Sequence, residues 1–350
     1  MKKTPLLGMT LEELQDVCLQ LSMPKFTAKQ MAQWIYGKHI HEIEEMTNLS
    51  KVNREKLDSL FCVGCAAPIE TSKSKDGTIK YLFPTDNGKF VETVYIPDGD
   101  RATLCVSCQV GCKMNCLFCQ TGKQGWHGDL TATNILNQVY AVSQIIEKEG
   151  GTPLTNIVYM GQGEPLDNID HVLKSIKILT AEYGWAWSPR RITVSTVGLR
   201  KNMRRLLDES ECHVAVSLHS PIHEQRLQLV PAEKQFAIND IISLLKEYDW
   251  SHQRRITFEY TMFGGTNDTT LYAKELVKLL QGIDCRVNLI HWHLVPDVPL
   301  KEVSTKSMEN FRDYLNNHGI TATIRASRGQ DIWAACGLLS TKKQLENQTI

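Results

Sequence analysis

The sequence contains no long apolar run, and no stretch approaches the roughly 20 residues that a membrane-spanning helix requires. Residues 1–8 show no extended apolar segment of the kind that a secretory signal carries, so we expect a cytoplasmic protein without membrane contact. Internal repeats and low-complexity segments are also absent. The formal net charge is zero, which excludes a globally basic chain and leaves only a local patch for nucleic-acid binding.

Cysteine, by contrast, is plentiful. The chain has 11 cysteines, and in a reducing compartment they indicate metal or redox chemistry rather than disulfide bonds. Cys112, Cys116 and Cys119 form a Cys-x3-Cys-x2-Cys loop that is short enough to turn three thiolates toward one point. A structural zinc site or an ordinary iron–sulfur site takes four protein ligands. Three ligands would leave one iron of a [4Fe-4S] cluster open for a substrate or cofactor; a zinc knuckle and unligated buried cysteines are the alternatives.

The first part of the chain, residues 1–65, is predicted to be a small helical unit. Thr10 with Glu13 and Thr27 with Gln30 form two candidate capping boxes, at the starts of two helices. Basic side chains of this unit could hold an RNA backbone or simply form a solvated face: Lys25, Lys29, Lys38, Lys51 and Arg54.

The pattern then changes to β-structure and afterwards to alternating strands and helices. Residues 66–100 read as a β-hairpin extension with turns at Asp76-Gly77 and Asn87-Gly88. Residues 101–340 alternate between strands and helices, which predicts an α/β core with a parallel sheet and a helical coat; residues 341–350 form a polar tail. Such sheets bind ligands at the carboxyl ends of their strands.

Polar residues follow several of the predicted strands. Gly163 and Glu164 follow one strand, and glycine lets a backbone approach a ligand while a carboxylate can accept from an ammonium group. Each such residue alone could be a cap or turn residue, but three successive strand ends favour a site: Ser195; Ser217, Leu218 and His219; and His293. Near the C-terminus, Cys336 precedes Gly337, and this thiol is expected either at the mouth of the sheet or as an inert buried group.

Arginine and lysine are dense around one helix. Arg190, Arg191, Arg200, Lys201, Arg204 and Arg205 lie within sixteen residues, and Arg254 and Arg255 begin another strand. Phosphate binding and ordinary solvated helix ends are both compatible with this pattern.

Together these motifs resemble the RlmN-type adenine-C2 methyltransferases of RNA, a family of radical S-adenosylmethionine (SAM) enzymes. The likeness spans nearly the whole chain, through the strand around Glu92, Arg101–Gly125, Gly163-Glu164-Pro165, Ile192–Leu199, the Ser217–Ser220 strand end and Asp331–Gly337. It implies a partial (βα)6 barrel, one [4Fe-4S] cluster on Cys112, Cys116 and Cys119, and two SAM molecules per turnover. It also implies SAM contacts at Gly163, Glu164, Ser195, Ser217, Leu218, His219 and His293.

The resemblance also implies a reaction. Cys336 takes a methyl group from one SAM, and a radical from a second SAM removes hydrogen from that methyl group. The resulting methylene radical adds to C2 of adenine and ties the RNA to Cys336. Glu92 or Cys105 accepts the C2 proton, and Cys105 releases the product by forming a transient disulfide with Cys336. The implied partners are 23S rRNA, tRNA and an electron donor such as flavodoxin or ferredoxin, with the enzyme acting as a monomer.

Three residues depart from the family pattern, and two other functions remain open. Cys108, Gln162 and His293 stand where Ser, Met and Asn are more common. Methylation at adenine C8, as in the related Cfr enzymes, is one alternative, although Pro165 favours the C2 family. A zinc-containing RNA-binding module, with Cys62, Cys65, Cys105 and Cys108 as ligands, is the other.

Overall fold

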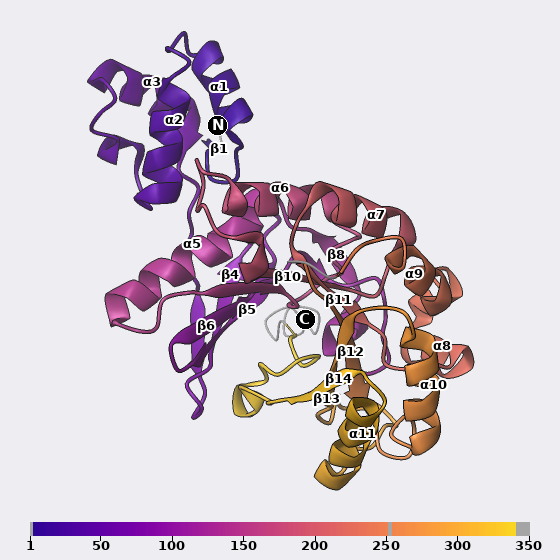
Figure 1. Ribbon diagram of the computed structural model, residues 1–350. Helices are drawn as coiled ribbons and strands as arrows, with labels where there is room; N and C mark the ends of the chain where they lie inside the picture. The colour runs from indigo at the N-terminus through magenta and orange to yellow at the C-terminus, as the bar shows by residue number, and fades with distance from the viewer. Residues whose placement is uncertain (1–2, 251–253, 341–350) are drawn as a thin grey trace.

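The computed structural model describes residues 3–250 and 254–340. Its centre is a ten-stranded sheet with the order β14-β13-β12-β11-β10-β9-β6-β5-β4-β3 (Figure 1). The strands from β6 to β14 are parallel, and β3, β4 and β5 join them in antiparallel pairs. The α/β fold with an open parallel core and a short β extension, predicted from the sequence, is therefore confirmed.

The parallel strands follow one another along the chain, and each connection carries a helix or turn. The strands are β6 (Arg101–Cys105), β9 (Asn156–Tyr159), β10 (Ile192–Thr196), β11 (His213–Ser217), β12 (Ile256–Met262), β13 (Cys285–His291) and β14 (Thr321–Arg325). The longer helices of the core are α5 (Ala132–Glu149), α6 (Ile169–Thr180), α7 (Arg200–Glu209), α8 (His223–Leu229), α9 (Ile238–Leu245), α10 (Thr270–Leu280) and α11 (Thr305–Asn317). In Figure 1, helices α6, α7, α9, α10 and α11 form an arc outside the strands.

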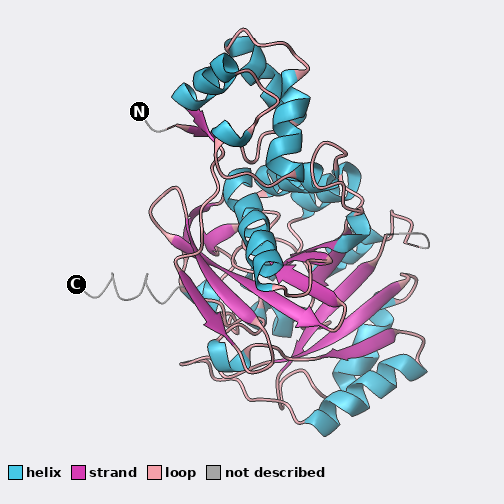
Figure 2. Cartoon of the chain, turned by 90° about the vertical axis from the view of Figure 1, so that its left-hand side faces the viewer, coloured by secondary structure: helices cyan, strands magenta, loops and turns pink. Residues whose placement is uncertain are grey.

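The extension consists of β3 (Glu70–Lys73), β4 (Ile79–Pro84) and β5 (Phe90–Asp98), and the two predicted turns connect them. Figure 2 shows these strands continuing the same twisted sheet as the parallel ones. A separate two-stranded ribbon, β7 (Gln109–Gly111) with β8 (Trp126–Asp129), encloses the cysteine loop and the short helix α4 (Gln120–Lys123).

The N-terminal unit contains α1 (Leu11–Gln20), α2 (Thr27–Ala32), a π-helical turn (Gln33–Gly37) and α3 (Lys51–Leu60). The capping box at Thr10 and Glu13 is present. The one predicted at Thr27 and Gln30 is wrong, because α2 starts after Phe26 in helical conformation and has no side-chain cap. The short strands β1 (Thr4–Pro5) and β2 (Phe61–Cys62) close this unit.

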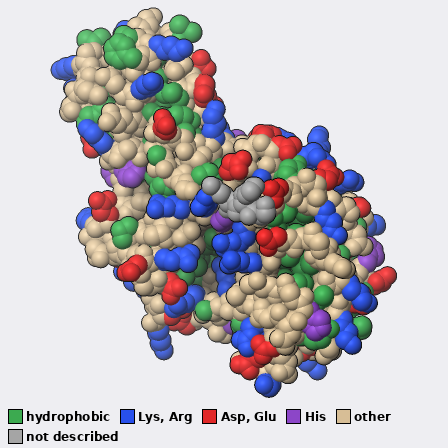
Figure 3. Space-filling view, in the orientation of Figure 1, with side chains coloured by type: hydrophobic (Ala, Val, Ile, Leu, Met, Phe, Trp, Pro, Cys, Tyr) green, Lys and Arg blue, Asp and Glu red, His purple; other side chains and the backbone are tan. Residues whose placement is uncertain are grey.

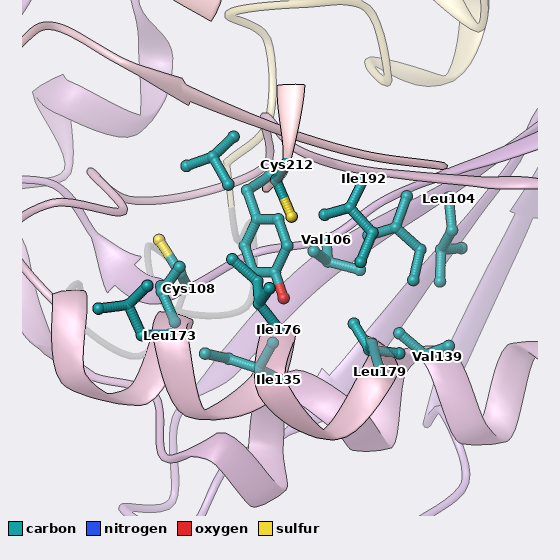
Figure 4. Packing of buried hydrophobic residues seen from close by; sticks show 14 of the residues in the cluster. Leu104, Val106, Cys108, Ile135, Val139, Leu173, Ile176, Leu179, Ile192 and Cys212 are labelled. Atoms are coloured by element: carbon teal, nitrogen blue, oxygen red, sulfur yellow. The ribbon is translucent and has the colours of Figure 1, made fainter. Parts of the chain in front are cut away.

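Apolar side chains from the sheet and from α5 and α6 make the main core. In Figure 4, Leu104 and Ile192 of the sheet, with Val106 just after β6, pack against Ile135, Val139, Ile176 and Leu179 of the two helices. The N-terminal unit shares this hydrophobic cluster and is bound to α5 through Tyr140, whose hydroxyl donates to Ile40 O at 2.5 Å. Within residues 3–250 and 254–340, none of the helices combines the length and the apolar character that crossing a lipid bilayer requires.

Candidate active site at the carboxyl ends of the strands

A cavity of about 160 Å³ lies at the carboxyl ends of β9 to β14, beneath the cysteine loop. Parallel strands end at one edge of a sheet, so residues far apart in sequence meet here. The lining includes Cys112, Cys116, Cys119, Gly163, Glu164, Ser195, Ser217, His219, Glu259, Thr261, Trp292, Arg325 and Cys336. Most of the residues predicted from the strand ends therefore share one cavity.

The β7–β8 ribbon fixes the cysteine loop through close backbone contacts. Cys112 N donates to Gly125 O at 3.0 Å, and a Cβ on Gly111 would lie 1.8 Å from that same oxygen. Gly122 is also tight, because a Cβ there would lie 3.1 Å from Cys116 N. On the other side, Leu117 N donates to Leu229 O at 2.9 Å. These contacts hold all three thiols on one wall of the cavity.

The environment of the three thiols fits an iron–sulfur cluster. Burial is the main cause that raises the pKa of Cys112, Cys116 and Cys119, so these thiols are hard to ionise without a cation. A bound metal supplies that positive charge and deprotonates a coordinating thiol. Among the described residues, no group of three or more potential ligands is close enough to share a single metal ion. A cubane binds each thiolate at a different iron, so its ligands stand farther apart than those of one zinc ion.

Glu164 is held at the floor of the cavity by three donors. Its carboxylate accepts from Thr196 Oγ1 at 2.5 Å, from Val197 N at 3.0 Å and from Leu166 N at 3.0 Å. The side chain is almost fully buried, and burial raises the pKa of Glu164 to about 7 despite these donors. Near neutral pH this carboxyl is thus poised between its two charge states, which suits a group that meets a cation.

The loop that carries Glu164 is fixed by Gln109 and Gln162. Gln109 Oε1 accepts from Glu164 N at 2.8 Å, and a Cβ on Gly163 would lie 2.5 Å from the Gln109 side chain. Gln162, where the family more often has Met, is fully buried; its Oε1 accepts from Glu92 N at 3.1 Å and its Nε2 donates to Gln124. The departure at Gln162 therefore links this loop to the strand of Glu92.

His219 lies in the cavity as a neutral imidazole. Its backbone has a φ of 56°, and its Nδ1 accepts from Thr261 N at 3.0 Å, so the ring proton sits on Nε2. Burial lowers the pKa of His219 to about 3, with the nearby Arg226 adding to the effect. This histidine can donate one hydrogen bond but carries no charge at neutral pH.

Arg226 joins the ends of two strands. It is fully buried on α8 and donates to Val197 O and Leu218 O at 3.0 Å each and to Ser217 O at 2.9 Å. Glu233, also buried, is its ion-pair partner. This pair fixes the loops that present Ser195, Ser217 and His219 to the cavity.

Leu218 and His293 do not line the cavity. Leu218 is fully buried, and its backbone NH donates to Glu259 O at 3.0 Å. Beyond β13 it is Trp292 that faces the cavity, and His293 instead bonds Ser327 Oγ through Nε2 at 2.5 Å. The prediction that His293 lies at this site does not match the cavity lining.

Cys336 is exposed and stands on the wall of the cavity, which rules out the inert buried reading. Gly337 O accepts from Gln120 N at 2.8 Å and ties its loop to α4. Cys105, at the end of β6, is buried in a small hydrophobic cluster that includes Val94 of β5 and Ala334, two residues before Cys336. Burial raises the pKa of Cys105 to about 12, and the next cause is the charge of Cys336 itself. The two sulfurs are thus electrostatic neighbours.

Glu92 lies outside the cavity, beneath the C-terminal segment (residues 326–340). It is buried rather than solvent-facing, and Ser340 N donates to its Oε2 at 2.8 Å. Lys80 Nζ lies 2.9 Å from Glu92 Oε1. The segment that carries Cys336 therefore covers this carboxylate.

Two charged residues of the cavity were missed in the sequence, Glu259 and Arg325. Glu259 lies in the middle of β12 and Arg325 is the last residue of β14, whereas the predicted site residues came from the other strand ends and the loops after them. A charged residue inside an otherwise apolar strand is the sequence signal that identifies Glu259.

The basic cluster is divided between the two ends of the sheet. Arg190 and Arg191 precede β10, and Arg254 and Arg255 precede β12, so all four lie at the amino ends, away from the cavity. Arg200 and Lys201 begin α7 just after the carboxyl end of β10, and the helix then runs back, so that Arg205 shares a pocket with Pro189 and Cys212 near the amino ends. Arg204 pairs with Glu247, and Arg205 pairs with Asp170 and Glu209. The carboxylate partners of Arg204 and Arg205 weaken the case that they bind phosphate.

Comparison with known proteins agrees with this architecture. Residues 4–63 match the ribosomal RNA large subunit methyltransferase N-terminal domain, and residues 106–280 match the radical SAM superfamily. A probable dual-specificity RNA methyltransferase RlmN of Bacteroides thetaiotaomicron is 58% identical over 99% of both chains. The dual-specificity RNA methyltransferase RlmN of Alcanivorax borkumensis is 40% identical over 97% of this chain and 90% of its own.

Solved structures give the same result. A radical SAM methyltransferase from Sphaerobacter thermophilus superposes with a TM-score of 0.90, at 40% identity, over 96% of this chain and 99% of its own. The similarity covers the N-terminal unit, the extension and the core alike. The chain belongs to the RlmN family of dual-specificity RNA methyltransferases, within the radical SAM superfamily.

Proposed function

We propose that this protein methylates C2 of an adenine in 23S rRNA and of the adenine 3′ to the anticodon in some tRNAs, through a methyl group carried on Cys336. Its membership of the RlmN family supports an RNA methyltransferase. The observation that carries the proposal is the position of Cys336, which shares one cavity with three cluster-type cysteines and is the electrostatic neighbour of Cys105.

A single [4Fe-4S] cluster would be held by Cys112, Cys116 and Cys119, and SAM would bind beside it. When bound and reduced, this cluster supplies the electron that cleaves SAM and generates a 5′-deoxyadenosyl radical. Glu164 would accept from the ammonium group of SAM. Ser195, Ser217 and the Nε2–H of His219 would bind its other polar groups.

Cys336 would act first as a nucleophile. Its sulfur takes the methyl group of one SAM by displacement, which an exposed thiolate can do and the electron-poor C2 of adenine cannot. Removal of one hydrogen from that methyl group then gives a carbon radical able to add to C2. The exposure of Cys336 matters here, because the target base must leave its stack and reach this sulfur.

Release of the product would require Cys105 and a base. Loss of the C2 proton and of one electron, which the cluster would accept, would restore the aromatic ring. The Cys105 thiolate would then attack the sulfur of Cys336, so that the S–S bond forms as the bond from that sulfur to the methylene carbon breaks, and this carbon takes up a proton to give the methyl group of the released adenine. Glu92 is the proposed acceptor of the proton. Because the C-terminal segment covers Glu92, that segment must move aside before Glu92 can meet the base.

RNA binding is supported by the distribution of charge. In Figure 3, Lys and Arg side chains gather near the middle of the face shown, although the chain as a whole is neutral. Local positive charge of this kind attracts a phosphate backbone, so binding should weaken as salt rises.

The test is the nucleoside composition of RNA from cells that lack this protein. We expect 2-methyladenosine to disappear from 23S rRNA and tRNA and to return when the wild-type chain is supplied. Unchanged 2-methyladenosine in both RNAs would refute the proposal, and loss of 8-methyladenosine instead would assign the C8 reaction. Iron in anaerobically purified protein separates both from the zinc alternative, in which zinc replaces iron.

A further inference from the structure

Arg325 is the last residue of β14, and together with Cys336 it lines two neighbouring cavities. The active-site cavity and a second one of about 360 Å³ on its other side share Arg325, Cys336 and Ile290 in their linings. The second cavity is also lined by Asp98, Arg101 and Arg328 and opens toward the β5–β6 turn. The guanidinium group of Arg325 therefore lies near the sulfur of Cys336, the proposed methyl carrier.

The guanidinium of Arg325 is only loosely engaged by its neighbours. Nη1 lies 3.4 Å from the sulfur of Met160 and 3.7 Å from Glu259 Oε2. Glu259 accepts from Asn288 Nδ2 at 3.0 Å through Oε1, whereas its Oε2 has no hydrogen-bond partner among the described residues. An arginine has five N–H donors, and a fork-to-fork pair with a carboxylate would occupy two of them. The looser geometry here leaves donors free for an anion in the cavity.

The thiols of Cys336 and Cys105 are surrounded by titratable groups from three other elements. These groups are Arg325 at the end of β14, Glu259 on β12 and Cys119 of the cysteine loop. Among these three residues, Arg325 is the cation. We propose that Arg325 is a positioning residue for the thiol pair, which stabilises the anion of Cys336 during methyl uptake and the anion of Cys105 during product release. This inference rests on the proposed function and extends it to a residue that was not among the site residues predicted from the sequence.

Transfer of the methyl group from SAM to Cys336 needs no further reagent. The proton of Cys336 leaves to solvent, the thiolate attacks the SAM methyl carbon, and the new S–CH3 bond forms as the sulfonium C–S bond breaks. The electron pair of that bond remains on sulfur, so S-adenosylhomocysteine leaves as a neutral thioether. The negative charge beside Arg325 has then disappeared.

Methylation of Cys336 changes the electrostatic environment that sets the pKa of Cys105. Burial and the charge of Cys336 both raise the pKa of Cys105, and Arg325 lowers it. Once Cys336 is methylated it can no longer be anionic, so one of the causes that raise this pKa is lost while Arg325 stays in place. Methylation therefore removes one cause that disfavours the Cys105 thiolate, while Arg325 still favours it.

The reactivity of Cys336 tests the first half of this inference. Anaerobic holoenzyme is treated with iodoacetamide at pH 7.5, and alkylation of the Cys336 peptide is followed by mass spectrometry in wild type, Arg325→Met and Arg325→Lys. The thiolate is the species that iodoacetamide alkylates, and the Arg325 guanidinium stabilises it, so Arg325→Met should react about tenfold more slowly. Arg325→Lys should restore most of the rate.

The matched control is Arg312→Met. Arg312 pairs with Asp313 on the surface of α11, and its side chain is 35% exposed against 30% for Arg325. It should react like wild type. Equal alkylation rates in Arg325→Met and wild type, at equal iron content and thermal stability, would overturn the inference.

A second measurement tests product release. Enzyme with Cys336 already methylated is given RNA substrate for one turnover, and the covalent RNA–protein adduct is quenched and counted. In Arg325→Met the adduct should persist several times longer than in wild type and Arg312→Met. An unchanged lifetime would remove Arg325 from the second step. A Cys105→Ala variant that forms neither adduct nor methylated RNA would instead refute the proposed function, so the two failures are distinct.

Discussion

Lys80 of β4 and Glu92 of β5 form an ion pair diagonally across neighbouring strands, with Nζ 2.9 Å from Oε1, and the C-terminal segment covers Glu92. Burial is the first cause that raises the pKa of Glu92, and Lys80 is the first that opposes it. Replacing Lys80 by Met leaves the carboxylate without its cation. We expect the variant to lose up to about 3 kcal/mol of unfolding free energy at pH 8.

The loss should grow with pH. In Lys80→Met the folded-state pKa of Glu92 lies further above its unfolded value, so the folded state binds the extra proton and stability falls as pH rises between the two. Denaturant unfolding at pH 5 and pH 8 measures this. Lys73→Met removes the exposed Lys73–Glu149 pair of the same extension and should cost less than about 0.5 kcal/mol. A loss in Lys80→Met that does not depend on pH would show that Glu92 is not left ionised.

SAM binding should depend on the charge of Glu164. Because its pKa is about 7 in the ligand-free site, an ammonium group meets a partly protonated carboxyl below neutral pH. The affinity for SAM should therefore fall as pH drops below 7, by up to about tenfold per unit. Titration of the holoenzyme with SAM between pH 6 and 8 measures the slope. Glu164→Gln should bind SAM weakly at every pH, and a slope that survives in this variant would assign the titration to another group.

Iron content should separate two kinds of cysteine. Cys112→Ala removes a thiol that lines the cavity, and the variant should purify with little iron and no brown colour. Cys108→Ala is the matched change, because Cys108 is buried only four residues before Cys112 but lies outside the cavity lining. It should keep its iron. If both variants lost iron equally, the assignment of Cys112 as a ligand would lose its support.

The Arg226–Glu233 ion pair should contribute both to the free energy of unfolding and to the binding of SAM. Arg226→Met leaves Glu233 buried without its cation and frees three backbone carbonyls, so a loss of about 3 to 5 kcal/mol is expected. Where the variant still folds, its KM for SAM should rise, because the strand ends that carry Ser195 and Ser217 are no longer tied together. Arg205→Met, which breaks only exposed pairs, should change neither the stability nor the KM by much.

The sequence was sufficient for the features that depend on spacing and periodicity. The cysteine loop is local, and the alternation of strands and helices places Glu164, Ser195 and Ser217 at one edge whatever the details of packing. The alternation of side chains along an extended chain also explains why His293 does not line the cavity. Ile290 and Trp292 line it, so the side chain that follows Trp292 points away.

Features that depend on a partner far along the chain could not be predicted. Glu92 reads as an exposed strand residue until Ser340 and Lys80 are seen to enclose it. The basic cluster reads as one surface because Arg191 and Arg200 are close in sequence, yet β10 lies between them and carries them to opposite ends of the sheet. Arg226 gives no signal at all, because its role depends on carbonyl groups of two other loops.

The two outer strands of the sheet, β3 and β14, are not paired with each other. The chain that leaves β14 nevertheless crosses to the other border, where Gly329 N donates to Asp76 Oδ2 and Asp331 accepts from Ser74 and from Lys75 N. An irregular segment thus connects the two borders of the sheet, and Cys336, the proposed methyl carrier, lies on that segment. Any outward movement of Cys336 that carries this segment along would therefore have to break these hydrogen bonds, and their re-formation would return the thiol to the neighbourhood of Cys105.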